Sequence, residues 1–338
     1  MSNGSTLVIK SEEQAFELLE QLTAEGLDLQ AQDITFEGWP VLTLRLQGEG
    51  FDSTITPPLM RAFLALQANI YRSYAIAKYN SPKISAISTN EKKDLEIAIR
   101  VEQGSSIFNV DLQAVLEKFS SELVGKMDPK TLLTMVLGVA VVWGGASSYK
   151  HYLDHRVKIR QEEAKSEEQQ ALVEHLKFSS EQETERMKIM ANVLQDNARL
   201  QSIANIAEDA RTELVKRSAV AQDVTIQGIH VTGEEAGELV KNARNKSEEV
   251  RLDGDYRILN VDSSNPDEFK VKVKSLDSGD VFIAKVQDNT LERRYLEALQ
   301  NGEWARHPVR LRINARQLNG DIKSALVIRA DLSDIEEQ

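Results

Sequence analysis

Two histidines in the middle of the chain have a spacing that could hold a metal ion. His151 and His155 are four residues apart, so they would lie on one face of a helix. No third ligand is close in sequence, and the chain has no cysteine to supply a thiolate or a disulfide. The pair therefore indicates solvated or interfacial polar residues, and we expect no metal and no cofactor.

Catalytic sequence signatures are missing as well. The chain has no glycine-rich phosphate loop ending in Gly-Lys-Ser/Thr, no Gly-x-Ser-x-Gly elbow and no His-Glu-x-x-His motif. Asp and Glu are so frequent that no single pair of them indicates acid/base chemistry. We expect that the protein is not an enzyme.

Basic residues alternate with apolar ones at two places near the C-terminus, as on a strand with one charged face. They are Lys270, Lys272 and Lys274 in the first run, and Arg310, Arg312 and Arg316 in the second. A solvated outer face of a sheet is one interpretation. The other is a basic groove for a nucleotide or a single-stranded oligonucleotide, to which Tyr256, Phe282 or Trp304 could add an aromatic ring.

A stripe of small or hydroxyl residues runs through the apolar segment 131–149. Its members are spaced by three or four residues, so they share one helix face; they are Thr131, Thr134, Gly138, Val141, Gly145 and Ser148. Such a stripe allows close packing of helices in a membrane oligomer. Alternatively, it lines a narrow pore, with the hydroxyls of Thr134 and Ser148 facing the opening. Both interpretations require a homo-oligomer.

The segment that carries this stripe contains no charged residue and no histidine. As a helix it would be about 28 Å long, close to the hydrocarbon thickness of a bilayer. Asp128 and Pro129 supply an N-cap and a first-turn proline. We predict a single transmembrane helix at 128–150; a buried core helix is the alternative, although such a helix usually has a polar face.

The following residues favour uninterrupted helix, because no glycine or proline occurs from Ser147 to Gln227. Val193, Leu200, Ala207 and Leu214 recur every seven residues, as in a coiled coil. We therefore predict that the transmembrane helix continues into a long helical stalk or coiled coil at 151–222, which would assemble the oligomer.

The remaining segments predict two small folded domains, so the fold class is α+β. Residues 1–126 alternate helical and strand patterns and indicate an α+β domain. Residues 223–249 are predicted to form a linker with a short helix. The helix begins at a capping box, Thr232-Gly-Glu-Glu235. Residues 250–338 have the order β-β-β-α-β-β, which resembles the OB-fold, a five-stranded barrel. An SH3-like or another small barrel is also compatible.

Charge constrains the partners and the location. The chain of 338 residues has 41 Lys and Arg against 53 Asp and Glu, a net charge of -12, which argues against a surface that coats duplex DNA.

The N-terminus shows no signal-peptide pattern, which favours a cytoplasmic first domain. Slightly more basic residues follow the apolar segment than precede it, which favours the opposite orientation.

The predicted layout resembles the membrane channel effectors of bacterial anti-phage defence systems, and within them the channel subunit of the Hailong system. The features that carry this resemblance are the 131–149 segment, the helix over 150–221 and the barrel over 250–332. The resemblance implies a homo-oligomeric, ligand-gated channel in the inner membrane, whose ligand is made by a partner enzyme. A non-conducting, membrane-tethered scaffold or binding protein is the alternative.

Overall fold

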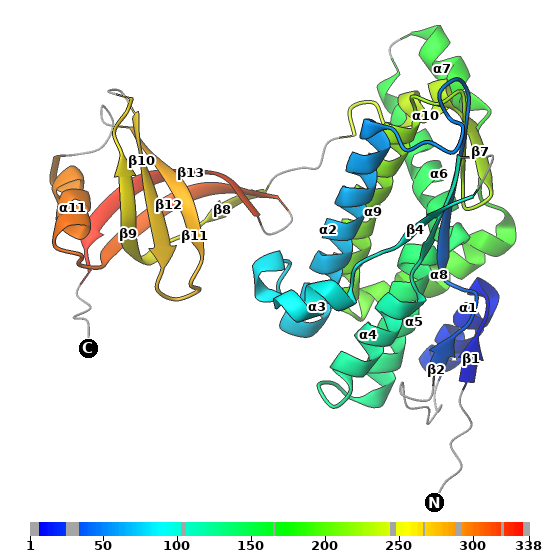
Figure 1. Cartoon of the computed structure of the whole chain (residues 1–338), viewed down its shortest axis with the longest axis horizontal. Coiled ribbons are helices and arrows are strands. Elements are labelled where there is room, and N and C mark those ends of the chain that lie inside the picture. The colour runs from blue at the N-terminus through cyan, green and yellow to red at the C-terminus, as the bar shows by residue number, and fades with distance from the viewer. Residues whose placement is uncertain are drawn as a thin grey trace, which may run out of the picture. The chain divides into compact units, whose positions relative to one another are not determined.

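The computed structural model describes residues 7–24, 34–102, 106–164, 166–243, 248–265, 268–287, 293–318 and 321–333. The chain divides into two compact units, Met1–Ala243 and Arg244–Gln338 (Figure 1). The segments predicted at 1–126, 128–150 and 151–222 all lie in the first unit, and the predicted barrel lies in the second.

The first unit is a mixture of helices and short strands. Its strands are β1 (Leu7–Ile9), β2 (Ile34–Phe36), β3 (Val41–Gln47), β4 (Ile99–Val101), β5 (Ser106–Asp111), β6 (Asp223–Ile226) and β7 (Ile229–Thr232). Its helices are α1 (Glu12–Ala24), α2 (Pro57–Tyr79), α3 (Thr89–Asp94), α4 (Gln113–Leu123), α5 (Pro129–Gly144), α6 (Ala146–Glu163), α7 (Glu167–Glu174), α8 (Glu181–Gln195), α9 (Ala198–Ser218) and α10 (Gly233–Leu239), with a 3-10 turn, η2, at Ile84–Ala86.

Strands from both ends of this unit pair with one another. The larger sheet is antiparallel, has the order β4-β5-β3-β6-β7, and places β6 directly beside β3. A separate two-stranded sheet joins β1 and β2 in parallel. Because β6, β7 and α10 complete the first unit, residues 223–239 belong to its fold.

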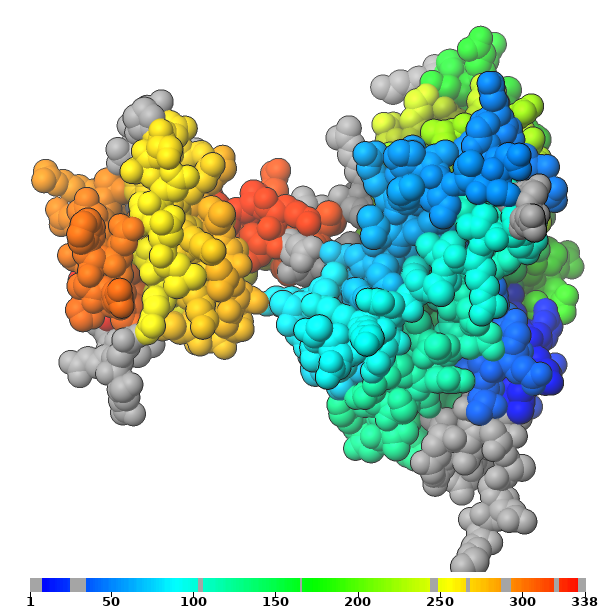
Figure 2. All heavy atoms as spheres, in the orientation of Figure 1, coloured from blue at the N-terminus to red at the C-terminus, as the bar shows by residue number. Residues whose placement is uncertain are grey.

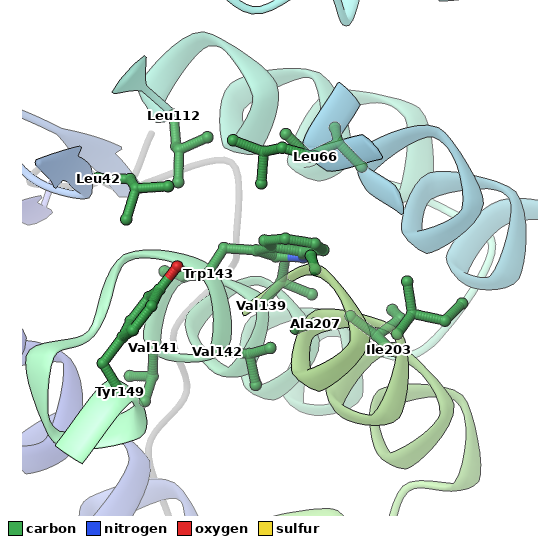
Figure 3. Packing of buried hydrophobic residues seen from close by; sticks show 14 of the residues in the cluster. Leu42, Leu66, Leu112, Val139, Val141, Val142, Trp143, Tyr149, Ile203 and Ala207 are labelled. Atoms are coloured by element: carbon green, nitrogen blue, oxygen red, sulfur yellow. The ribbon is translucent and has the colours of Figure 1, made fainter. Parts of the chain in front are cut away.

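Helix α5 lies in the centre of the core of this unit. Every residue from Met135 to Gly144 is buried. Figure 3 shows Trp143 directed toward Leu66 of α2, with Ile203 and Ala207 of α9 in the same cluster. Helices α2 and α9, far apart in the sequence, run side by side next to it (Figure 1). Helix α5, which is apolar on every face, is therefore surrounded by other parts of the same unit.

The single transmembrane helix predicted at 128–150 is wrong. The apolar segment bends by 60° at Gly145 and forms two helices, α5 and α6. Among the described residues, no single helix combines the length and the apolar character needed to cross a membrane; α5 and α6 satisfy these criteria only as a bent pair.

Groups from distant parts of the chain hold this bend. The Glu12 carboxylate accepts hydrogen bonds from the backbone N–H groups of Ala146 and Ser147, both at 3.1 Å, and so caps the start of α6. At the end of α5, the Gln227 amide donates to the Gly144 carbonyl at 2.7 Å. The groups that a continuous helix would pair internally therefore have partners from α1 and from the β6–β7 turn.

The long helix predicted at 151–222 is also wrong, because the segment forms four helices, α6 to α9. Side-chain caps interrupt it where the sequence has neither glycine nor proline. Ser166, Ser180 and Asn197 each accept a hydrogen bond from the backbone N–H three residues later, which starts α7, α8 and α9. The residues of the apparent heptad, such as Leu200 and Leu214, are buried in the core of the same chain.

The second unit is a small β-barrel, as predicted. Its elements are β8 (Glu248–Arg251), β9 (Gly254–Asp262), β10 (Glu268–Ser275), β11 (Val281–Gln287), α11 (Arg293–Trp304), β12 (Val309–Leu318) and β13 (Asp321–Leu332). Five strands close the barrel in the order β9-β10-β11-β13-β12, because β12 pairs with both β13 and β9. Strand β8 pairs with the far half of β12, and α11 comes between the third and fourth barrel strands.

Candidate functional site: the outer face of the barrel

The predicted small-residue stripe has partners within the chain. A Cβ atom on Gly138 would come within 2.4 Å of the Leu200 Cδ2 atom on α9, and one on Gly145 within 2.5 Å of the Glu12 Oε1 atom. The Ser148 hydroxyl donates to the Val141 carbonyl at 3.0 Å. Thr131 and Thr134, nearer the start of α5, are half-buried. The close approach that the stripe allows is therefore used inside the first unit.

His151 and His155 are both exposed on α6. The His151 ring is nevertheless partly shielded from water by its neighbours, and this partial burial, with the nearby His155, lowers the pKa of His151. Within the described part of the chain, no group of three or more His, Asp or Glu side chains is arranged to hold a metal ion.

A cluster of titratable residues joins α2, α3 and α4, and its groups are paired. The Lys78 ammonium contacts the carboxylates of Glu91 and Glu122, and the Tyr74 hydroxyl donates to Glu91 at 2.9 Å. Burial alone would raise the pKa of Glu91, but hydrogen bonds from Lys78 and Ser88 outweigh it, so the pKa is well below the usual range. This pairing is typical of an ion cluster that stabilises the fold. None of the four groups is left as a free general acid or base.

The three lysines predicted on one strand do share an outer face. Lys270, Lys272 and Lys274 are exposed on β10, while Val271 and Val273 between them are buried in the barrel. No carboxylate among the described residues lies within 4.0 Å of the three ammonium groups. Three solvated cations therefore stand in a row, about 6.8 Å apart along the strand. Asp262 of β9 is opposite Lys270 and interacts with its charge, whereas Lys272 and Lys274 are opposite Asn260 and Arg257.

The strand next to β10 extends this face. In the β10–β11 register, Lys270 is opposite Lys285, Lys272 is opposite Ile283, and Lys274 is opposite Val281. Ile283 and Val281 are 56% and 49% exposed. The outer surface of β9, β10 and β11 is continuous in Figure 2, where these strands are yellow to amber. We call the side chains of Lys270, Lys272, Lys274, Val281, Ile283 and Lys285 the β10–β11 face.

The β12 arginines lie elsewhere on the barrel. Strand β9 separates β10 from β12, so the six predicted basic residues do not form one row. Arg310 is opposite Asp331 and Asp255, and Arg316 forms an ion pair with Glu249 at 3.2 Å. Arg312 is opposite another cation, Arg329. Acidic neighbours thus offset two of the three arginines.

A hollow of about 510 Å³ lies beside one end of the β10–β11 face. Basic residues from both the β10–β11 face and strand β12 line it. Lys285 of β11 and Arg316 of β12 both line it, with Arg251 of β8. Glu249 and Glu268 line it as well, and Lys285 pairs with Glu268 at 2.9 Å. The hollow is therefore mixed in charge, whereas Lys272 and Lys274 of β10 have no acidic residue opposite them on either neighbouring strand.

The three aromatic residues are not on this face. Tyr256 is buried inside the barrel, where its hydroxyl donates to the Leu252 carbonyl at 3.1 Å and its ring meets Phe282 edge-on at 5.8 Å. Trp304 is 86% exposed, but it ends α11. The β10–β11 face therefore offers ammonium groups and aliphatic surface to a ligand, without an aromatic platform.

Comparison with protein-family models, with curated proteins and with solved structures found no match.

Sequence reasoning missed Val281, Ile283 and Lys285 as members of the site. They alternate with Phe282, Ala284 and Val286, and this period of two places them on the outer surface of a strand. That signal was present in the sequence. The pairing of β11 with β10, which joins these residues to the lysines, is shown by the strand register.

Proposed function

We propose that this protein is a binding protein whose C-terminal barrel holds a single-stranded oligonucleotide by its phosphates along the β10–β11 face. The observation that carries the proposal is the row of three exposed lysines, none of which has a carboxylate oxygen within 4.0 Å among the described residues. Successive phosphates of an extended strand can follow cations placed at every second residue of a β-strand.

The position of the face in the barrel supports this ligand. Strands β10 and β11 are the second and third strands of the five-stranded barrel. OB-type barrels bind oligonucleotides on the face of these two strands. The exposed Ile283 and Val281 would pack against sugars and bases without reading them, so we expect weak dependence on sequence.

The charge distribution fits a local interaction. Residues 244–338 contain 16 Lys and Arg against 18 Asp and Glu, so the barrel unit contributes little of the net charge of -12. The acidic excess is in residues 1–243, which would repel nucleic acid. A polyanion should therefore contact a limited basic strip and release few counterions.

A pair of charge-reversal variants tests the proposal. Lys270→Glu with Lys272→Glu should weaken binding of a fluorescein-labelled oligothymidylate about 100-fold, because two phosphate contacts become repulsive. The matched control is Arg310→Glu with Arg312→Glu on β12, which should change the Kd less than about threefold. Fluorescence anisotropy at fixed salt measures both, and circular dichroism checks that the barrels are folded. Equal losses in the two variants, or no binding by the unmodified chain, would refute the assignment of this face.

The channel interpretation depended on a single spanning helix. Among the described residues, no single helix is long and apolar enough to be one. Conduction, a role in anti-phage defence, an inner-membrane location and a partner enzyme stay predictions. The homo-oligomer also stays a prediction, and the two glycines of the small-residue stripe give it no support because they pack within the chain. The alternative considered from the sequence is a non-conducting, membrane-tethered scaffold or binding protein assembled by its coiled coil, and the present proposal keeps only its binding without conduction.

A further inference from the structure

A second candidate site is a cavity of about 320 Å³ between four helices of the first unit. Val142 of α5, Tyr152 of α6 and several residues of α8 and α9 line it. Its α8 wall is largely apolar and includes Met187, Met190 and Leu194. This volume and lining are typical of a site for a small organic molecule with an apolar body.

The cavity has a buried cation in its wall. Arg211 of α9 is only 6% exposed, and it lines the cavity. One guanidinium nitrogen donates to the Val142 carbonyl near the end of α5, and the guanidinium lies 5.0 Å from the centre of the Tyr149 ring. Among the described residues, no carboxylate oxygen lies within 4.0 Å of it.

A buried guanidinium without an anion is costly, because its charge loses water and gains no counterion. Arg211 has five N–H donors, and one backbone acceptor and one aromatic ring satisfy only part of this capacity. Burial lowers its pKa, and the weaker opposing influence of Tyr149 and Glu208 does not restore it. By contrast, Arg160, which is also deeply buried in the described part of this unit, contacts two carboxylates.

We propose that this cavity binds a small apolar carboxylate, with the ligand's carboxylate on Arg211 and its apolar body against α8. A planar carboxylate matches the guanidinium fork, and the methionine side chains adapt to different apolar shapes. Two exposed residues of opposite charge, Lys188 and Glu208, also border the cavity and offset each other, and most of the α8 wall is apolar, so a ligand with several charges is disfavoured.

The test is a matched series of probes on the full chain. The probes are the straight-chain carboxylates from butanoate to decanoate and phenylacetate, each with its neutral primary amide. At least one carboxylate should bind saturably and raise the Tm of the first unit by about 5 °C at a hundredfold excess over its Kd. Its amide should bind at least tenfold more weakly. No saturable binding of any carboxylate, or equal affinity for acid and amide, would overturn the proposal.

Two variants separate ligand binding from a structural role of Arg211. Ala191 is exposed at the cavity wall, so Ala191→Trp should fill the cavity, abolish carboxylate binding and leave the Tm of the free protein nearly unchanged. Arg211→Met should remove the preference for acid over amide. If Ala191→Trp folds and still binds the carboxylate with the original Kd, the ligand is bound elsewhere and the proposal is wrong. Isothermal calorimetry measures each Kd directly.

Discussion

Gly138→Leu is expected to lower the free energy of unfolding of the first unit by about 3 kcal/mol. Even a Cβ atom at this position would lie 2.4 Å from the Leu200 Cδ2 atom, and leucine adds three more carbons. Leu200 is fully buried on α9, so it has little room to move aside. Urea unfolding followed by circular dichroism measures the loss. A membrane-packing role for Gly138 would instead leave the stability of this unit in water unchanged.

Controls at a second glycine and at the contact partner make the interpretation specific. Gly237 lies within α10, where a Cβ atom would meet only the Ala219 Cβ atom at 3.8 Å. Gly237→Ala should therefore be neutral or stabilising by up to about 1 kcal/mol. Adding Leu200→Ala to Gly138→Leu should recover part of the lost stability, because the two side chains share one space. Additive losses in the double variant would contradict this contact.

Glu238→Ala should also destabilise the first unit by about 3 kcal/mol, because it leaves a buried guanidinium with one fewer partner. Arg160 is 2% exposed on α6 and contacts Glu238 of α10 and Glu163. Burial opposes ionisation of Glu238, but hydrogen bonds from Arg160 and Lys241 outweigh it and hold its pKa below the usual range. The remaining partner, Glu163, is 43% exposed in its side chain and compensates weakly.

Glu163→Ala is the matched control for this ion pair. It removes the exposed partner of the same arginine and should cost less than about 1 kcal/mol. The double variant Arg160→Met with Glu238→Leu should be more stable than Glu238→Ala alone, because no unpaired charge stays buried. Urea unfolding curves of the three variants decide the question; equal stabilities of Glu163→Ala and Glu238→Ala would contradict the assigned roles.

Local signals in the sequence predicted several helix starts correctly. The Asp128 carboxylate caps α5 by accepting from the Thr131 N–H at 2.9 Å, with Pro129 in the first turn. The capping box at Thr232 and Glu235 starts α10. These features depend on residues three positions apart, so a sequence shows them directly.

The end of α5 could not be predicted in this way. An uncharged run of 19 residues is compatible with a continuous spanning helix and with a bent pair. The bend is held by Glu12 and Gln227, which are more than 80 residues away in the sequence on either side. No residue near Gly145 in the sequence indicates that Glu12 and Gln227 are its partners. In addition, small residues allow close helix packing in a membrane and in a protein core alike.

In the barrel, alternation predicted the outward direction of the lysines and arginines, and their exposure agrees with it. Alternation says which side of a strand a residue occupies, but not which strands are neighbours. Of the six predicted basic residues, three are on β10 and three are on β12, and strand β9 lies between these two strands. Lys285 of β11 lies beside the β10 lysines.

The dependence of oligonucleotide binding on salt tests the central claim most directly. Three lysine–phosphate contacts along β10 predict a slope of about -2 when log K is plotted against log salt for a single strand. Neutralising one lysine with Lys272→Gln should reduce the steepness by about 0.7, whereas Arg312→Gln on β12 should leave it unchanged. Anisotropy titrations across a range of sodium chloride concentrations give these slopes. A slope near zero, or one that changes with Arg312→Gln and not with Lys272→Gln, would contradict binding on this face.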